Sequence, residues 1–277
     1  MEIERRLARE MAKGITGFGM LEDGDRVMVC VSGGKDSYTL LELLRDLASR
    51  APVRFDLKVV NVDQGHPGYP GHVLEAYMAR EGHDFKMVRE DTYSIVREKV
   101  PEGKTTCSLC SRLRRGILYR VATELGCNKI ALGHHRDDVL QTLLLNLFFS
   151  GRLAAMPPIL RAATGHVVIR PLIHCAEEDI RAYASARGFP ILPCDLCGAQ
   201  EDLQRKVVGR MLDDLEAKRP GTKQVMLAAL RNVRPTQLLD TGLWTRLGIS
   251  FAEEDEYTLS GRPDVVPARR LVDRRAT

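Results

Sequence analysis

Short apolar runs alternate along most of the chain with stretches whose apolar residues recur every three or four positions. Residues 27–31 are five consecutive apolar residues, a pattern typical of a strand buried on both faces. Residues 37–50 follow, with leucines at spacings of one, three and three, which places them on one face of a helix. The main pattern of the chain therefore begins with a strand that leads directly into a helix.

The same alternation continues to about residue 232. It predicts strands at 26–31, 55–62, 85–88, 128–132, 167–170 and 189–192. It predicts helices at 37–50, 72–81, 107–125, 138–149, 177–187, 201–217 and 222–232. Strands that alternate with helices form βαβ units with right-handed crossovers, so we expect an α/β fold, a Rossmann-like parallel sheet flanked by helices. Ligands of such sheets bind beyond the carboxyl ends of the strands.

The pattern divides the chain into three parts. Residues 1–24 read as an N-terminal helical segment, 25–240 as the main domain, and 241–277 as a tail in which the periodicity fades. Four acidic residues at 253–256 and a set of arginines at 268–275 make this tail strongly charged, so we expect it to be mobile.

Composition narrows the class of protein. Of the 277 residues, 44% are hydrophobic and 28% are charged, as in soluble globular proteins. No apolar run is long enough to span a bilayer, and no apolar segment of a secretory signal follows the N-terminus. We therefore expect a cytoplasmic protein with no membrane partner and with its seven cysteines reduced. A net charge of +4 is compatible with a nucleic-acid partner without requiring one.

The loop after the first strand carries the clearest chemistry. Its two glycines let backbone amides approach a ligand, and the helix that follows points the positive end of its dipole at the same place. It is not a Walker A loop, because Lys35 is followed by Asp36 rather than by serine or threonine. The sequence predicts a phosphate-binding loop made of Ser32, Gly33, Gly34, Lys35, Asp36 and Ser37.

Two further strand ends carry polar groups. Asp63 follows the second strand, and Gly133, His134, His135, Arg136, Asp137 and Asp138 follow the strand at 128–132. Because this second loop and the loop at 32–37 both follow strands, the two can face one crevice. The two aspartates fit either a ligand role or N-caps of the helix at 138–149, and the roles of the two histidines stay open.

Four of the cysteines form two Cys-x-x-Cys pairs, Cys107/Cys110 and Cys194/Cys197. Two such pairs beside predicted helices indicate a metal centre, which the spacing alone leaves open between a structural zinc, an iron–sulfur cluster and a redox dithiol. Cys30, Cys127 and Cys175 have no cysteine nearby in the sequence, and we interpret them as structural.

These motifs together resemble a known family. The run at 32–37 resembles the PP-loop of the N-type ATP pyrophosphatases, which have the adenine nucleotide alpha hydrolase-like fold and split ATP to AMP and pyrophosphate. The ordered set of the PP-loop, Asp63, the segment 104–115, the loop 133–138 and the segment 193–198 resembles the tRNA 2-thiocytidine synthetases, also called tRNA cytidine 2-sulfurtransferases. The resemblance covers about residues 15–240.

The resemblance implies a reaction and its cofactors. Members of this family use ATP, Mg²⁺ and a [4Fe-4S] cluster to thiolate C2 of cytidine 32 in tRNA. It implies that Cys107, Cys110 and Cys197 hold the cluster, with Cys194 as the alternative third ligand. It further implies that Lys35 and Asp36 are catalytic, that Asp36 binds Mg²⁺, and that Asp63, Gly133, Asp137 and Asp138 help to bind ATP. A cysteine desulfurase as sulfur source and a homodimer are expected on the same ground.

Several interpretations stay open at this stage. Arg112, Arg114 and Arg115 fit either tRNA phosphate contacts or a solvated helix face. One alternative function is a PP-loop tRNA 2-thiouridine synthetase, although those enzymes usually carry zinc-finger cysteines near both ends and residues 1–29 and 198–277 contain none. The other is a non-catalytic, zinc-stabilised RNA-binding module, which leaves the phosphate loop unexplained.

Overall fold

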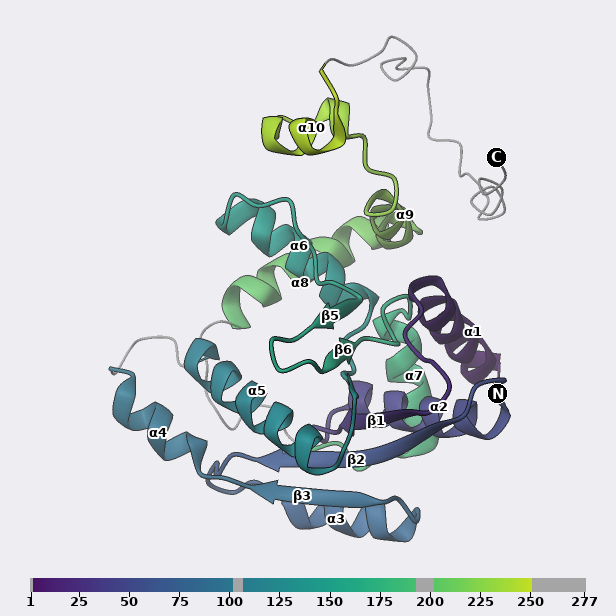
Figure 1. Cartoon of the computed structure of the whole chain (residues 1–277), viewed down its shortest axis with the longest axis vertical. Helices are drawn as coiled ribbons and strands as arrows, with labels where there is room; N and C mark the ends of the chain where they lie inside the picture. The colour runs from purple at the N-terminus through teal and green to yellow at the C-terminus, as the bar shows by residue number, and fades with distance from the viewer. Residues whose placement is uncertain (1, 102–106, 193–201, 251–277) are drawn as a thin grey trace. The chain divides into compact units, whose positions relative to one another are not determined.

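The computed structural model describes residues 2–101, 107–192 and 202–250, and a six-stranded sheet forms its centre (Figure 1). The strand order is β3-β2-β1-β4-β6-β5, in which every neighbouring pair is parallel except β5 with β6. The strands are β1 Asp25–Cys30, β2 Phe55–Asp63, β3 Phe85–Arg89, β4 Lys129–Ala131, β5 Ile159–Arg161 and β6 Val167–Ile169. The predicted parallel α/β fold is confirmed.

Helices connect the strands and cover the sheet (Figure 1). The helices of the described residues are α1 Glu2–Phe18, α2 Lys35–Arg50, α3 Gly71–Arg80, α4 Thr92–Lys99, α5 Cys107–Glu124, α6 Arg136–Phe149, α7 Glu177–Arg187, α8 Asp202–Lys218, α9 Thr222–Ala229 and α10 Thr241–Leu247, with a short 3-10 helix at Pro235–Gln237. None of these helices is both long and apolar enough to cross a membrane. α2 packs against α7, and α7 against α1.

The apolar runs of the sequence form the core. Val27, Met28 and Val29 of β1 are fully buried, as a strand between two neighbours in a doubly covered sheet requires. Met28 also belongs to a cluster in which Ile117 and Val121 of α5 pack on the strands. The burial of β1 fixes the position of the loop that follows it.

Strand order brings the two predicted loops together. Chain connections run from β1 outward to β2 and β3, and then return to β4 on the other side of β1, so the winding reverses between β1 and β4. In the register, Val29 pairs with Ala131, which places the carboxyl ends of both strands level with each other. This is the edge at which open α/β sheets bind ligands.

The structure corrects the predicted elements at some places. Residues 189–192 are not a strand: Pro190 has no amide to donate to a ladder, and the Leu192 amide donates to the Gly33 carbonyl at 2.9 Å instead. The short elements α4 and β5 and the helix α10, which lies beyond residue 240, were not expected from the periodicity.

By its internal contacts the chain divides into two compact units, Met1–Leu227 and Ala228–Thr277. The first unit includes α1 together with the sheet and the loops at its edge. In the second unit, the indole Nε1 of Trp244 donates to the carbonyls of Pro235 and Leu238 at 2.7 and 3.0 Å, which ties α10 to the short 3-10 helix.

Candidate active site

The loop after β1 is organised by its own serines. The Ser37 hydroxyl donates to the Gly34 carbonyl at 2.8 Å, and the Ser32 amide donates to Ser37 Oγ at 3.2 Å. Gly33 has φ of +84°, a conformation that glycine adopts without strain. Gly34 is the N-cap of α2 and contributes no capping side chain, so the first amides of the helix are left for an anion. The geometry is that of a phosphate-binding turn.

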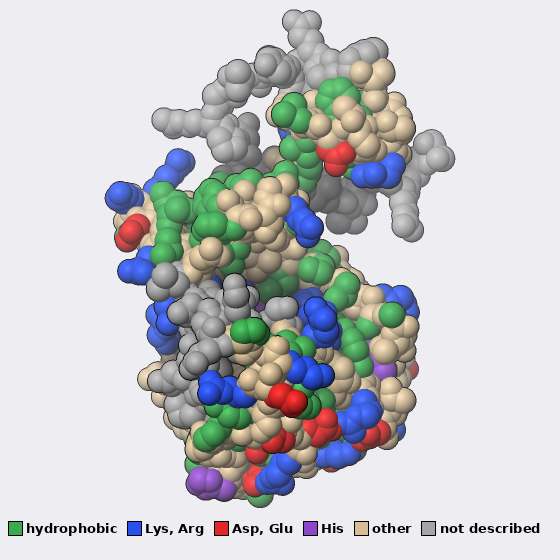
Figure 2. All heavy atoms as spheres, turned by 90° about the vertical axis from the view of Figure 1, so that its left-hand side faces the viewer, with side chains coloured by type: hydrophobic (Ala, Val, Ile, Leu, Met, Phe, Trp, Pro, Cys, Tyr) green, Lys and Arg blue, Asp and Glu red, His purple; other side chains and the backbone are tan. Residues whose placement is uncertain are grey.

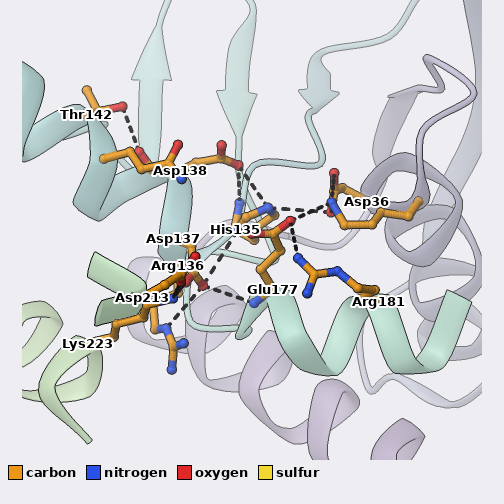
Figure 3. Close-up of polar contacts among 12 residues, drawn as sticks. Asp36, His135, Arg136, Asp137, Asp138, Thr142, Glu177, Arg181, Asp213 and Lys223 are labelled. Atoms are coloured by element: carbon orange, nitrogen blue, oxygen red, sulfur yellow. Dashed lines mark hydrogen bonds and ion pairs between the residues drawn. The ribbon is translucent and has the colours of Figure 1, made fainter. Parts of the chain in front are cut away.

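Lys35 stands between two carboxylates in this turn. Its Nζ lies 3.1 Å from Asp36 Oδ1 and 3.0 Å from Glu177 Oε1, the latter at the start of α7 (Figure 3). Burial opposes the charged form, but the two carboxylates outweigh it and raise the pKa of Lys35. Burial likewise opposes the ionised form of Glu177, and the hydrogen bond and charge of Lys35 lower its pKa. Both groups are therefore charged at neutral pH.

The loop after β4 packs directly on the loop after β1. A Cβ built on Gly133 would lie 3.0 Å from the carbonyl carbon of Asp36, closer than most Cβ contacts, so a larger residue would push the two backbones apart. The His135 ring lies between two carboxylates, with Nε2 3.5 Å from Asp36 Oδ1 and 3.4 Å from Asp138 Oδ2. The structure therefore brings the two predicted loops together at one edge of the sheet.

Asp137 is buried and ties three helices together. Its carboxylate accepts the Glu177 amide of α7 at 3.0 Å and forms an ion pair with Lys223 of α9 at 2.8 Å. Burial favours its neutral form, but the hydrogen bond from Lys223 and the charge of Arg136 lower its pKa. Asp137 thus fixes the end of α7 that presents Glu177 to Lys35 (Figure 3).

Helix α6 begins at Arg136, two residues earlier than predicted, and its N-cap residue is His135. The interpretation of Asp137 and Asp138 as an N-cap pair is therefore wrong in position. Asp138 does serve the cap, because its carboxylate accepts the His135 amide at 3.1 Å. Asp138 Oδ1 also lies 3.5 Å from the Arg205 guanidinium of α8.

The remaining polar groups lie around this crevice. Burial lowers the pKa of His134 to about 4, which keeps its ring neutral at pH 7. Asp63 is the last residue of β2, and its carboxylate accepts the Gly65 amide at 3.0 Å. Because β2 pairs with β1, Asp63 lies at the same edge of the sheet as the loop.

The structure describes part of the cysteine set. Cys107 and Cys110 lie one turn apart at the start of α5, and Cys110 Sγ is 3.3 Å from Oε1 of Gln64, the residue after β2. This contact puts Cys110 at the carboxyl edge of the sheet. The Cys107 side chain, Cys194 and Cys197 lie outside the described residues. Within the described part of the chain, no three His, Cys, Asp or Glu side chains gather as a metal site.

The three other cysteines behave as structural residues. Cys127 and Cys175 are buried among apolar neighbours. Burial also raises the pKa of the Cys30 thiol to about 12, so it stays protonated.

Tertiary packing supplies partners that the sequence did not reveal. Glu177, Lys223, Arg205 and Gln64 all contact predicted site residues from other elements. Only Glu177 had a local signal, since it opens a predicted helix with three acidic residues in its first turn. That pattern is common at helix starts and does not identify a partner for Lys35.

Three arginines of α5 are accessible. Arg112, Arg114 and Arg115 are exposed, as either a phosphate-binding or a solvated face requires. Figure 2 views the molecule from the left-hand side of Figure 1, and Lys and Arg side chains are spread over the face that it shows.

Comparison with known proteins agrees with this geometry. The family model of the PP-loop domain matches residues 2–212. The chain is 61% identical to the tRNA-cytidine(32) 2-sulfurtransferase of Sorangium cellulosum, over 98% of this chain and 99% of that protein. It is 56% identical to the protein of the same name from Shigella boydii, over 91% of this chain and 82% of that protein.

A solved structure extends the comparison. The U34-tRNA thiolase NcsA of Methanococcus maripaludis, solved with its [4Fe-4S] cluster, matches with a TM-score of 0.68 and 25% identity, over 83% of this chain and 79% of that one. From the match of the domain and the identity with the curated relatives, the chain belongs to the PP-loop domain family and, within it, to the tRNA-cytidine(32) 2-sulfurtransferases.

Proposed function

We propose that this enzyme replaces O2 of cytidine 32 in tRNA by sulfur, after activating that oxygen with ATP. The single observation that carries the proposal is the PP-loop at the β1/β4 edge, where Lys35 is held between Asp36 and Glu177. The identity of 61% with a tRNA-cytidine(32) 2-sulfurtransferase supports the choice of substrate. The likeness to a tRNA thiolase that carries a [4Fe-4S] cluster supports the choice of cofactor.

A carbonyl oxygen is a poor leaving group, so it has to be activated first. The base oxygen attacks the α-phosphorus of ATP, the bond from that phosphorus to the bridging oxygen breaks, and pyrophosphate leaves. Loop amides, the hydroxyls of Ser32 and Ser37 and the ammonium of Lys35 lie where they can neutralise the departing charge. One carboxylate together with phosphate oxygens suits Mg²⁺, so Asp36 is the residue that would hold it.

The sulfur step needs a donor beside the activated base. Cys110 lies at the same sheet edge as the PP-loop, and thiolates are the ligands that iron–sulfur clusters take. We assign Cys107, Cys110 and Cys197 as the residues that would hold a [4Fe-4S] cluster. When bound by three thiolates, such a cluster has one iron without a protein ligand, at which sulfur can be carried. Addition of sulfur to C2 then expels AMP.

The proposal also includes the sulfur source, the cellular compartment and the oligomeric state. A cysteine desulfurase would supply the sulfur as a persulfide, and a two-electron reductant such as a dithiol would release it as sulfide before it adds to C2. The enzyme would act in the cytoplasm, and two copies would form a homodimer. These parts follow from family membership, and each is independent of the active-site geometry.

Nucleoside analysis tests the function. We expect tRNA from a strain that lacks this gene to contain no 2-thiocytidine, and the wild-type gene to restore it while Lys35→Ala does not. Loss of 2-thiouridine with 2-thiocytidine unchanged would favour the 2-thiouridine alternative. A colourless protein with stoichiometric zinc, in a strain with normal tRNA thiolation, would favour the RNA-binding module.

Iron content of four single variants tests the cluster ligands. After anaerobic reconstitution we expect Cys107→Ala, Cys110→Ala and Cys197→Ala to lose iron, and Cys194→Ala to retain most of it. If Cys194→Ala loses iron and Cys197→Ala keeps it, the third ligand is Cys194. Equal loss in all four variants would indicate a closed four-thiolate site and contradict the open-iron mechanism.

A further inference from the structure

A groove outside the crevice runs between α6 and α8. It has a volume of about 430 Å³. Its lining residues, all but the first from α8, are Gln141, Arg205, Lys206, Gly209, Arg210 and Asp213. Gly209 lets the two helices approach, since a Cβ there would lie 3.3 Å from the Gln141 side-chain amide.

The groove is positively charged. Arg205, Lys206 and Arg210 are all exposed. Among the described lining residues, Asp213 is the one acidic side chain, and it lies 2.6 Å from Lys223. The described lining therefore carries an excess of positive charge.

Two of the three cations, Lys206 and Arg210, lie away from the apolar packing of α8. Among the described residues, the buried apolar side chains of this helix are Val208 and Leu212. At about 100° per residue, Arg205 lies beside Leu212, whereas Lys206 and Arg210 lie on the opposite side of the helix. The packing of α8 therefore does not explain why Lys206 and Arg210 are cations.

Short distances connect this groove to the crevice. The Arg205 guanidinium lies 3.4 Å from Gln141 Oε1 and 3.5 Å from Asp138 Oδ1. Asp138 in turn lies 3.4 Å from His135, whose ring is 3.5 Å from Asp36 of the PP-loop. A series of side-chain contacts thus links the groove to Asp36 of the PP-loop.

We propose that this groove binds the phosphodiester backbone of the RNA substrate next to the nucleotide that enters the crevice. The proposal rests on the proposed function, which requires that an RNA nucleotide reach the PP-loop edge. Phosphates that flank this nucleotide must then leave the crevice along a neighbouring surface, and cations that meet them there stabilise the complex without reading its sequence.

The arrangement fits a chain of phosphates better than a single anion. At about 1.5 Å of rise per residue, the cations from Arg205 to Arg210 spread over roughly 7.5 Å of helix rather than converging on one point. The described lining residues include no aromatic side chain, so this part of the groove is suited to the backbone rather than to base stacking.

The test measures RNA affinity against salt for the full-length protein and an unmodified tRNA transcript. In the triple variant, Arg205, Lys206 and Arg210 become Gln. In the control, the exposed cations Arg5, Arg9 and Lys13 of α1 become Gln. We expect the groove variant to bind on the order of tenfold more weakly at low salt. Its log–log salt slope should fall by about one unit for each phosphate that is no longer neutralised.

The control should keep the wild-type slope. The KM for ATP should be unchanged in the control and in the single variants Lys206→Gln and Arg210→Gln, which leave the Arg205–Asp138 contact in place. An unchanged slope in the groove variant overturns the proposal, and so does a raised KM for ATP with unchanged RNA binding, which would assign the groove to a free polyphosphate. If the triple variant does not fold, the single variants Lys206→Gln and Arg210→Gln are measured instead. Each should lower the log–log salt slope of RNA binding by about one unit.

The outcome is separable from that of the proposed function. If the wild-type enzyme does not thiolate tRNA, the proposed function fails whatever the groove variant does. If it thiolates tRNA and the groove variant keeps its salt slope, only the groove assignment fails.

Discussion

Two charged regions adjoin at α6, and they differ in how their charges are paired. In the crevice, Lys35, Asp36, Asp137 and Glu177 are buried or half-buried, and each lies against an opposite charge. In the α6–α8 groove, the cations are exposed and outnumber the acids. Buried, paired charges hold geometry, whereas exposed, unbalanced charges attract a partner through solvent. The difference predicts different responses to substitution.

The largest expected effect comes from the crevice. Replacing Lys35 or Asp36 by Ala should lower tRNA thiolation by at least about 100-fold, because on the proposed function Lys35 neutralises the reacting phosphates and Asp36 holds the Mg²⁺ that does the same. Lys58→Ala is the matched control, since that lysine pairs with Asp84 on the surface of β2. Pyrophosphate release measures the effect. Release at the wild-type rate by either loop variant would show that the loop charges are dispensable.

Glu177→Gln should have a smaller and more selective effect. The carboxylate positions Lys35 but repels a polyphosphate, so we expect kcat to fall about tenfold while the KM for ATP stays the same or drops. The exposed neighbour Glu178→Gln is the control. A raised KM with unchanged kcat would contradict a positioning role for this carboxylate.

Lys223→Met should mainly lower the thermal stability of the protein. It removes one of the two described cations beside the buried carboxylate of Asp137 and leaves Arg136 at 3.4 Å, and the loss of a partner from a buried ion pair costs about 3 kcal/mol. For a unit of this size, that lowers Tm by about 6–12 °C. Lys218→Met, at the exposed end of α8, should leave Tm nearly unchanged. Equal Tm values for the two variants would show that the Asp137–Lys223 pair adds nothing to stability.

The same pair predicts a pH dependence. The pKa of Asp137 is lowered in the folded state, so its contribution is present above the unfolded value of about 3.9 and is lost as the pH falls through the folded pKa. The pKa of Lys223 is raised, so its contribution is lost only as the pH rises above about 10.4. The Tm difference between wild type and Lys223→Met should be constant from about pH 5 to 9 and should narrow below about pH 4.

The smallest effect on function is expected from substitutions in α5. Changing Arg112, Arg114 and Arg115 together to Ala should weaken tRNA binding and lower the salt slope by about one unit for each arginine that neutralises a phosphate. Folding should not change, because all three side chains are exposed. Comparison with the α6–α8 triple variant ranks the two surfaces. An unchanged slope would identify the α5 arginines as a solvated face.

Local pattern was sufficient for the framework of the sheet. The apolar run that ends at Val31 and the helix that follows could be predicted because burial on both faces and leucine spacing are visible in consecutive residues. The strand predicted at 189–192 was wrong because it, too, was inferred from consecutive apolar residues alone. Its apolar residues pack beside the PP-loop, where a Cβ on Gly33 would lie 2.6 Å from Leu192, and no ladder forms there.

The residues of the phosphate loop could be predicted from the sequence, but the residues from other helices that stabilise the site could not. Ser32 to Ser37 are contiguous, so their chemistry is visible in the sequence. Lys223 lies far along the chain from its partner Asp137, and no periodicity relates the two positions. Tertiary packing of α9 against α6 decides that contact, and packing is the part of the fold that a single sequence does not state.

The ion pair between Asp137 and Lys223 also has a practical consequence for anyone who trims this protein. The PP-loop domain match ends at residue 212, but Lys223 and the buried Leu227 come after it. A recombinant fragment cut at the family boundary would therefore carry the complete phosphate loop and yet lack Lys223, one of the two described cations beside Asp137. The family match therefore ends before the residues that stabilise the site. A fragment expressed for study should extend past Leu227 rather than stop at residue 212.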